Sequence, residues 1–190
     1  MKNIETILRT IERELIRTYA VLDAWFDEEP GVLQYLPAGG GRCCSEVLEQ
    51  LMHTNGNLLS SIEMACREAR QRAADAAVDH TTDWSHYTLL EALALERCMH
   101  TLYTAAAATQ TLSHDDVRSR MRGQLGICLD HLDTLCHGEG TLYKTTLPLQ
   151  EPVTVDVYQH LYFLAHFGRS HVKRLEENKA EFALLGRNLN

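Results

Sequence analysis

Residues 4–26 read IETILRTIERELIRTYAVLDAWF, and they set the fold class of this chain. The apolar side chains recur at steps of three and four, at Ile4, Ile7, Leu8, Ile11, Leu15, Tyr19, Leu22 and Phe26. Such steps place them in one stripe along an α-helix, with polar side chains on the opposite face. The pattern predicts an amphipathic helix over residues 2–27 that buries its stripe against other elements.

The prolines indicate where long helices are interrupted. All four lie in two short zones, Pro30 with Pro37 and Pro148 with Pro152. Proline inside a helix costs about 3 kcal/mol, so the proline-free stretches between the zones suit a bundle of long helices. We therefore predict an all-α protein that forms a single domain over residues 1–190, with a loop at 28–42.

Four further helices are expected beyond that loop. Their predicted ranges are 44–75, 89–108, 113–137 and 154–186. Ser113 with Asp116 three positions later matches a capping box, and Gly138 supplies a helix stop. Thr154 is expected to cap the last helix. No alternating strand pattern appears, so the connector before Thr154 is predicted to be a loop.

Charge and composition narrow the classes of partner. The chain is 45% hydrophobic and 23% charged, with a net charge of -8 at pH 7. Phosphate backbones and anionic lipids would repel such a chain, so nucleic acid and membrane surfaces are not expected partners. There is no signal-peptide pattern and no run of about 18 apolar residues, so the expected location is cytoplasmic.

Several short stretches occur in an order that is shared with a known family. They are Tyr35–Ala38, Glu46–Glu49, Thr54-Asn55, Arg122 with Gln124-Leu125, Cys128-Leu129, Gly138–Gly140, Leu142-Tyr143, Thr145-Thr146, Asp156–Gln159, Tyr162–Ala165, Arg169 and His171. In this order they resemble the DinB superfamily, in the broad sense that includes YfiT-like and thiol-transferase members. The resemblance covers most of the chain except residues 76–110. It implies a four-helix bundle with a long crossover between its second and third helices, an extra helix at 87–110 within a crossover insertion of about 76–112, and a homodimer.

Members of that family commonly bind a divalent metal through three histidines, one on the second helix and two on the last. At the corresponding positions this chain has Gln50, Phe167 and His171. A phenyl ring cannot ligate a metal, and glutamine is a weak ligand for zinc or nickel. The resemblance therefore implies a degenerate metal site in which His171 is the remaining imidazole. No tightly bound cofactor is expected, and nickel or zinc are the metals to test.

Other histidines do not restore the set. At 100° per residue, His53 falls on the expected wet face of the second helix, and His166 lies about 140° around the last helix from His171. His160 shares the face of His171 but lies roughly 16 Å away along the axis. A π-bulge at Gly168 is the distortion that would turn His166 inward.

The cysteines offer a second candidate site. The six cysteines lack the paired spacing of a structural zinc site. Four are interpreted as small core side chains, namely Cys66, Cys98, Cys128 and Cys136. Cys43 and Cys44 fall at the start of the second helix, where amide donors, the helix dipole and Arg42 lower the pKa of a thiol. The neighbouring glycines indicate exposure, so the pair is either reactive or part of a helix cap that happens to contain cysteines.

Three functions remain open at this point. The first is a bundle that binds a small molecule in a pocket at the bundle end near Gln50, Phe167 and His171. The second is a metal-dependent hydrolase, or a transferase that uses a low-molecular-weight thiol, because a metal lowers the pKa of bound water or thiol. The third is a redox protein that uses Cys43 or Cys44. The missing histidines favour the first, and whether the chain is an enzyme stays open.

Overall fold

The structure is a computed structural model that describes residues 3–75, 84–89, 112–147 and 152–188. Four long helices contain most of these residues: α1 (Ile4–Ala24), α3 (Cys44–Asp75), α5 (His114–Thr134) and α6 (Val157–Asn188). The shorter elements are the 3-10 turns η1 (Trp25–Asp27), η2 (Trp84–His86) and η4 (Glu139–Thr141), the one-turn helix α2 (Pro30–Leu33), and the strands β1 (Lys144–Leu147) and β2 (Val153–Asp156). The expectation of a predominantly helical protein is confirmed. The helix expected at 89–108 lies outside the described residues, apart from its first position.

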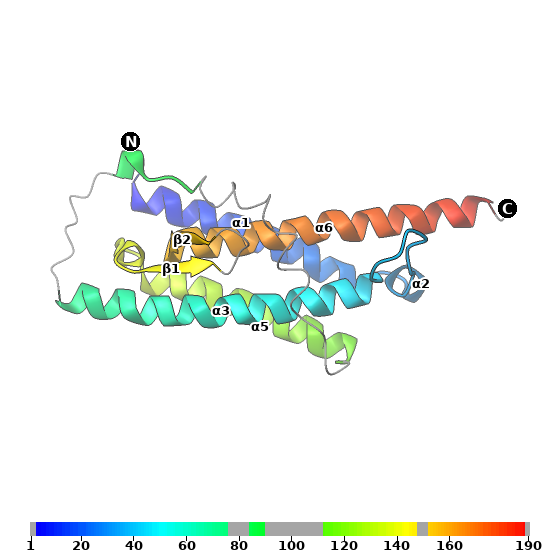
Figure 1. Ribbon diagram of the computed structural model, residues 1–190, viewed down its shortest axis with the longest axis horizontal. Coiled ribbons are helices and arrows are strands. Elements are labelled where there is room, and N and C mark those ends of the chain that lie inside the picture. The colour runs from blue at the N-terminus through cyan, green and yellow to red at the C-terminus, as the bar shows by residue number, and fades with distance from the viewer. Residues whose placement is uncertain (1–2, 76–83, 90–111, 148–151, 189–190) are drawn as a thin grey trace.

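The four long helices lie side by side along the long axis of the molecule (Figure 1). α1 and α6 run in one direction, and α3 and α5 run in the other. Among the described residues, α6 packs against both α1 and α3, and α5 packs against the same two helices. The end of α3 and the start of α5 therefore lie at opposite ends of the molecule.

The apolar stripe of α1 is buried as its spacing predicts. Ile11, Leu15 and Leu22 are fully buried, and Ile7 and Tyr19 are nearly so. The other long helices contribute their own apolar faces to the same hydrophobic cluster, which therefore joins all four. This shared core fixes the positions of the helix ends, where the loops and caps lie.

Both signals predicted around α5 are present. The Ser113 Oγ accepts a hydrogen bond from the Asp116 amide at 3.1 Å, which confirms the N-cap. α5 ends at Thr134, three residues before the predicted end, and Gly138 follows with a φ of 106°. Only glycine adopts this left-handed backbone without strain. A Cβ at position 138 would also lie 2.6 Å from the Trp84 ring, so both conformation and space require glycine there.

The connector before α6 corrects the prediction of a plain loop. β1 and β2 form an antiparallel hairpin in which Lys144 lies opposite Asp156 and Leu147 lies opposite Val153. Strands of four residues show too little alternation to be recognised by period, which is why the sequence did not reveal them. The predicted loop at 28–42 also contains structure, because Pro30 begins the one-turn helix α2, a position that proline favours.

The cap of α6 is Asp156 and not Thr154, because β2 continues through Asp156 and the helix begins at Val157. The Asp156 Oδ1 accepts from the Gln159 amide at 2.9 Å, and the Gln159 Oε1 accepts from the Asp156 amide at 3.1 Å. This reciprocal pair is a capping box. The Tyr87 hydroxyl lies 2.8 and 2.9 Å from the two carboxylate oxygens of Asp156, so the cap also anchors the segment that contains η2.

In the part of the chain that the structure describes, no helix combines the length and the apolar character that crossing a membrane requires.

Candidate functional site

Gln50 lies on α3, Phe167 and His171 lie on α6, and all three side chains are almost completely buried. These helices are antiparallel neighbours, and the Cys44 Sγ lies 4.0 Å from the carbonyl oxygen of Leu175. Gln50 lies six residues after Cys44 on α3. Because the helices are antiparallel and each rises by about 1.5 Å per residue, Gln50 is level with the residue six before Leu175, about residue 169 of α6. The three positions therefore share one level of the molecule.

His171 is held as a neutral imidazole. Its Nδ1 lies 3.0 Å from the carbonyl oxygen of Phe167, and its ring packs edge-on against the Phe167 ring with the centroids 4.6 Å apart. A carbonyl oxygen only accepts, so Nδ1 carries the hydrogen and Nε2 carries the lone pair that a metal would need. Burial lowers the pKa of His171 to about 4, and the positive charge of Arg174 acts in the same direction.

The Gln50 side chain is hydrogen-bonded to an arginine. Its Oε1 accepts a hydrogen bond from the Arg42 Nη1 at 2.8 Å. The carbonyl oxygen of Arg42 in turn accepts from the Asn178 Nδ2 of α6 at 3.0 Å, which fixes the arginine between the two helices. A metal cation beside Gln50 would meet the charge of this guanidinium. Across the described ranges, no group of three or more His, Cys, Asp or Glu side chains is arranged to hold a metal ion.

Three other histidines, His53, His160 and His166, lie on the same two helices. His53 is half-exposed, with its Nε2 3.9 Å from the Glu49 Oε1. The His166 ring packs against Tyr162 with the centroids 4.4 Å apart. α6 is α-helical throughout its length, so it has no π-bulge at Gly168, and the His166 side chain is buried without one. His160 is fully buried, and its two ring nitrogens have no hydrogen-bond partner within the described structure.

The cysteine pair is buried, which corrects the expectation that the glycine-rich loop exposes it. Cys43 is 9% exposed and Cys44 is 0% exposed. Burial raises the pKa of both thiols, and the Glu46 carboxylate raises that of Cys43 further. The guanidinium of Arg42 binds Gln50, and the Cys43 amide donates to the Glu46 Oε2 at 3.0 Å. These contacts are those of a helix cap, and they do not favour a reactive thiolate.

The exposure of the thiols predicts their order of alkylation. Cys136 is exposed, whereas Cys43, Cys44, Cys66 and Cys128 are buried. Because a buried thiol with a raised pKa is inert, iodoacetamide should modify Cys136 before the other four. Peptide mass spectrometry over a time course measures the order. Cys98 lies outside the described residues, so it is replaced by serine in the protein that is labelled. Earlier modification of Cys43 or Cys44 would restore the reactive-pair hypothesis.

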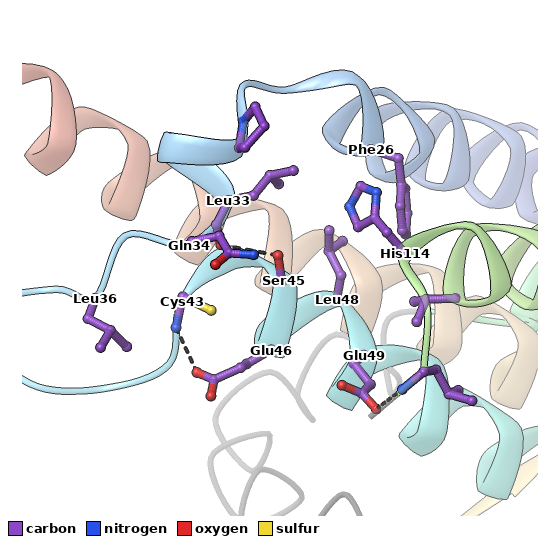
Figure 2. A pocket seen from close by; sticks show the side chains of 13 residues that line it. Phe26, Leu33, Gln34, Leu36, Cys43, Ser45, Glu46, Leu48, Glu49 and His114 are labelled. Atoms are coloured by element: carbon purple, nitrogen blue, oxygen red, sulfur yellow. Dashed lines mark hydrogen bonds between the residues drawn. The ribbon is translucent and has the colours of Figure 1, made fainter. Parts of the chain in front are cut away.

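A separate pocket of about 530 Å³ opens at the end of the molecule where α3 and α5 begin (Figure 2). It lies between η1, α2 and the first turns of α3 and α5. The lining residues are Phe26, Pro30, Leu33, Gln34, Leu36, Cys43, Ser45, Glu46, Leu48, Glu49, Leu112, His114 and Val117. Gln50, Phe167 and His171, where a degenerate metal site was expected, are not among them, so this pocket is distinct from the one expected there.

The walls of the pocket are mainly apolar, with polar groups at a few points. The Phe26 and His114 rings pack against each other with the centroids 4.7 Å apart. The Ser45 Oγ donates to the carbonyl oxygen of Leu33 at 3.2 Å, which ties α2 to α3. Glu46 and Glu49 are three residues apart on α3 and therefore lie on one face of the helix, as Figure 2 shows.

The sequence carried only local signals for this pocket. Pro30 followed by Val32 and Leu33 marks a short helix with buried side chains inside a segment that was predicted to be a loop. No periodic pattern relates this segment to the start of α5, some eighty residues further along. Comparisons with models of protein families, with curated proteins and with solved structures found no match for this chain.

Proposed function

We propose that this protein binds a small organic molecule in the pocket between η1, α2, α3 and α5. The observation that carries the proposal is the pocket itself, with a volume of about 530 Å³ and apolar walls. Small-molecule sites commonly enclose about 300–1,000 Å³ and combine apolar walls with a few polar groups that orient the ligand. Phe26, Leu33 and Leu48 supply the apolar walls here, and Glu46 and Glu49 supply polar groups.

The proposal includes a DinB-like bundle with a degenerate metal site. Two observations support this bundle. The four long helices pack in a closed ring, each against two others. α3 and α5 also run in the same direction, so the chain must cross the length of the molecule between them, as a long crossover does. The phenyl ring at Phe167 and the guanidinium at Gln50 support the degenerate site. The homodimer is proposed from the family resemblance alone, and sedimentation velocity over a range of concentrations measures it.

Ligand binding is tested with N-phenyl-1-naphthylamine, an apolar fluorophore that is neutral at pH 7. We expect its emission to rise on binding to the protein and the rise to be lost in Gln34→Trp. Gln34 is exposed and lines the pocket, so an indole there narrows the pocket without removing a buried contact. Gln34→Ala is the matched control and should bind as the parent protein does. Equal binding by all three proteins would place the fluorophore elsewhere and refute the proposal.

Metal content tests the degenerate site against the alternative of a metal-dependent transferase or hydrolase. Protein purified without a chelator or a nickel column should carry well under one equivalent of nickel, zinc or iron by elemental analysis. The double variant Gln50→His with Phe167→His should bind one equivalent of nickel or zinc, because it places two imidazoles beside the His171 Nε2. Adding His171→Ala to that variant should abolish the binding. Stoichiometric metal in the unmodified protein, lost on His171→Ala, would instead favour the metal-dependent enzyme.

A further inference from the structure

The charges in the lining indicate which class of molecule the pocket takes. We infer that the ligand is an apolar molecule that carries a cationic group, such as a protonated amine. The inference rests on the proposed function and concerns the same pocket. Glu46 and Glu49 are the acidic residues of the lining, and within the described residues no lysine or arginine lines it.

Within the described residues, no lysine or arginine forms an ion pair with either carboxylate. The Glu46 Oε2 accepts from the Cys43 amide at 3.0 Å, and the Glu49 Oε1 accepts from the Leu112 amide at 3.4 Å. His53 is the basic side chain that pairs with Glu49 in the described chain, with its Nε2 3.9 Å from the Glu49 Oε1. Each glutamate thus accepts a hydrogen bond from one backbone amide, and the Cys43 thiol also interacts with the Glu46 carboxylate.

The helix ends at the pocket do not cancel this negative charge. The N-termini of α3 and α5 both lie beside it, and each helix start contributes a positive charge of about half an elementary unit. Two ionised carboxylates contribute about two negative units, so the balance is close to one negative charge. Arg118, which lies over the Phe26 ring, does not line the pocket and is paired with Asp23 at 2.8 Å and with Asp27 at 2.7 Å.

The apolar walls decide between an organic cation and a metal ion. The side chains of Phe26, Leu33 and Leu48 offer no oxygen or nitrogen ligand. An inorganic cation in the pocket would therefore lose water ligands that the apolar walls cannot replace. An organic cation uses both features, because its apolar part packs on the walls and its charge faces the glutamates. The negative charge of Glu46 and Glu49 attracts a cationic group and repels an anion.

Three probes of similar size and different charge test the inference: 2-phenylethylamine, 2-phenylethanol and 3-phenylpropionate. Each is titrated at pH 7 and low salt as a competitor of bound N-phenyl-1-naphthylamine. We expect the amine to compete at a concentration at least about tenfold lower than the alcohol, which corresponds to about 1.4 kcal/mol, and the carboxylate to compete least.

Variants assign the preference to the two glutamates. Glu46→Gln with Glu49→Gln should weaken competition by the amine about tenfold and change competition by the alcohol by less than about twofold. Glutamine keeps a carbonyl oxygen for the Cys43 and Leu112 amides, so the caps and the fold are retained, which thermal unfolding verifies. Glu68→Gln is the matched control, since Glu68 is an exposed acid on the same helix outside the pocket.

The outcomes separate the inference from the proposed function. If the amine and the alcohol compete equally, or if the double variant keeps the preference for the amine, the cationic ligand is refuted while the pocket remains a binding site. If none of the probes competes and Gln34→Trp leaves fluorophore binding unchanged, the proposed function itself is refuted. A preference for the carboxylate would overturn the electrostatic argument.

Discussion

Leu51→Ala and Leu164→Ala are each expected to lower the free energy of unfolding by about 2–5 kcal/mol, the range for truncation of buried leucines. Both side chains are fully buried, one on α3 and the other on α6, and both belong to the core cluster that joins the long helices. Each substitution removes apolar contacts and leaves a cavity that the neighbouring side chains fill only in part. Urea denaturation, followed by circular dichroism, measures the loss.

Leu184→Ala provides the control for the core truncations. Leu184 is 59% exposed on the last turns of α6, so its truncation should change the free energy of unfolding by less than about 0.5 kcal/mol. Similar small effects in the two core variants would mean that the buried faces of α3 and α6 are wrongly assigned. A large effect at Leu184 would indicate that self-association covers this end of α6.

The second large effect is a loss of stability in mild acid. Burial lowers the pKa of both His160 and His171 from 6.5 to about 4 in the folded protein. A lowered pKa means that the folded state prefers the neutral ring, so protonation favours unfolding. The contribution of each histidine to stability is complete above pH 6.5, declines as the pH falls toward 4, and is absent below that value.

The expected size of this acid effect follows from the two pKa values. Each histidine should account for about 2 kcal/mol of lost stability between pH 7 and pH 5, and for about 3 kcal/mol once fully protonated. Urea denaturation at pH 7 and at pH 5 measures the difference. The double variant His160→Leu with His171→Leu should lose much less stability over the same interval, because leucine does not titrate.

Other titrating groups are common to the parent and the double variant. Hydrogen bonds from Arg118 and Arg122 lower the pKa of Asp23, so its contribution is lost only below its unfolded value of 3.8. Burial raises the pKa of Asp156, so its effect has the opposite sign and stability falls as the pH rises above 3.8. Both aspartates are present in the parent and in the double histidine variant, so their contributions cancel when the two proteins are compared. An equal loss in parent and variant between pH 7 and pH 5 would show that the two histidines are not responsible.

The sequence by itself determined where the long helices lie. A step of three to four residues between apolar side chains is a local property, and it placed the buried stripe of α1 correctly. Proline and glycine act locally as well, so the interruptions at 28–42 and after α5 were found. Ser113 was recognised as a cap because its partner Asp116 is only three residues away. For each feature, the interacting groups are neighbours along the chain.

The tertiary structure alone decided the features in which distant segments meet. Thr154 and Asp156 both precede α6 at cap-like positions, and the cap is Asp156 because β2 extends to that residue before the helix begins. Cys43 and Cys44 looked exposed beside three glycines, yet both are buried, and Cys44 lies against Leu175 of α6. Burial reverses the expected pKa shift, because desolvation of a thiolate outweighs the local helix-end effect.

The pocket depends on the tertiary structure in the same way. Its walls come from η1, α2, α3 and α5, which span residues 26–117 of the chain. Each segment alone shows only a short apolar or acidic stretch. The sequence of one segment predicts neither which other segments pack beside it nor the space that is left between them. Helix formation depends on contacts between residues within one turn. A pocket depends on which faces of distant helices pack together and on where the side chains at the helix ends leave a space unfilled.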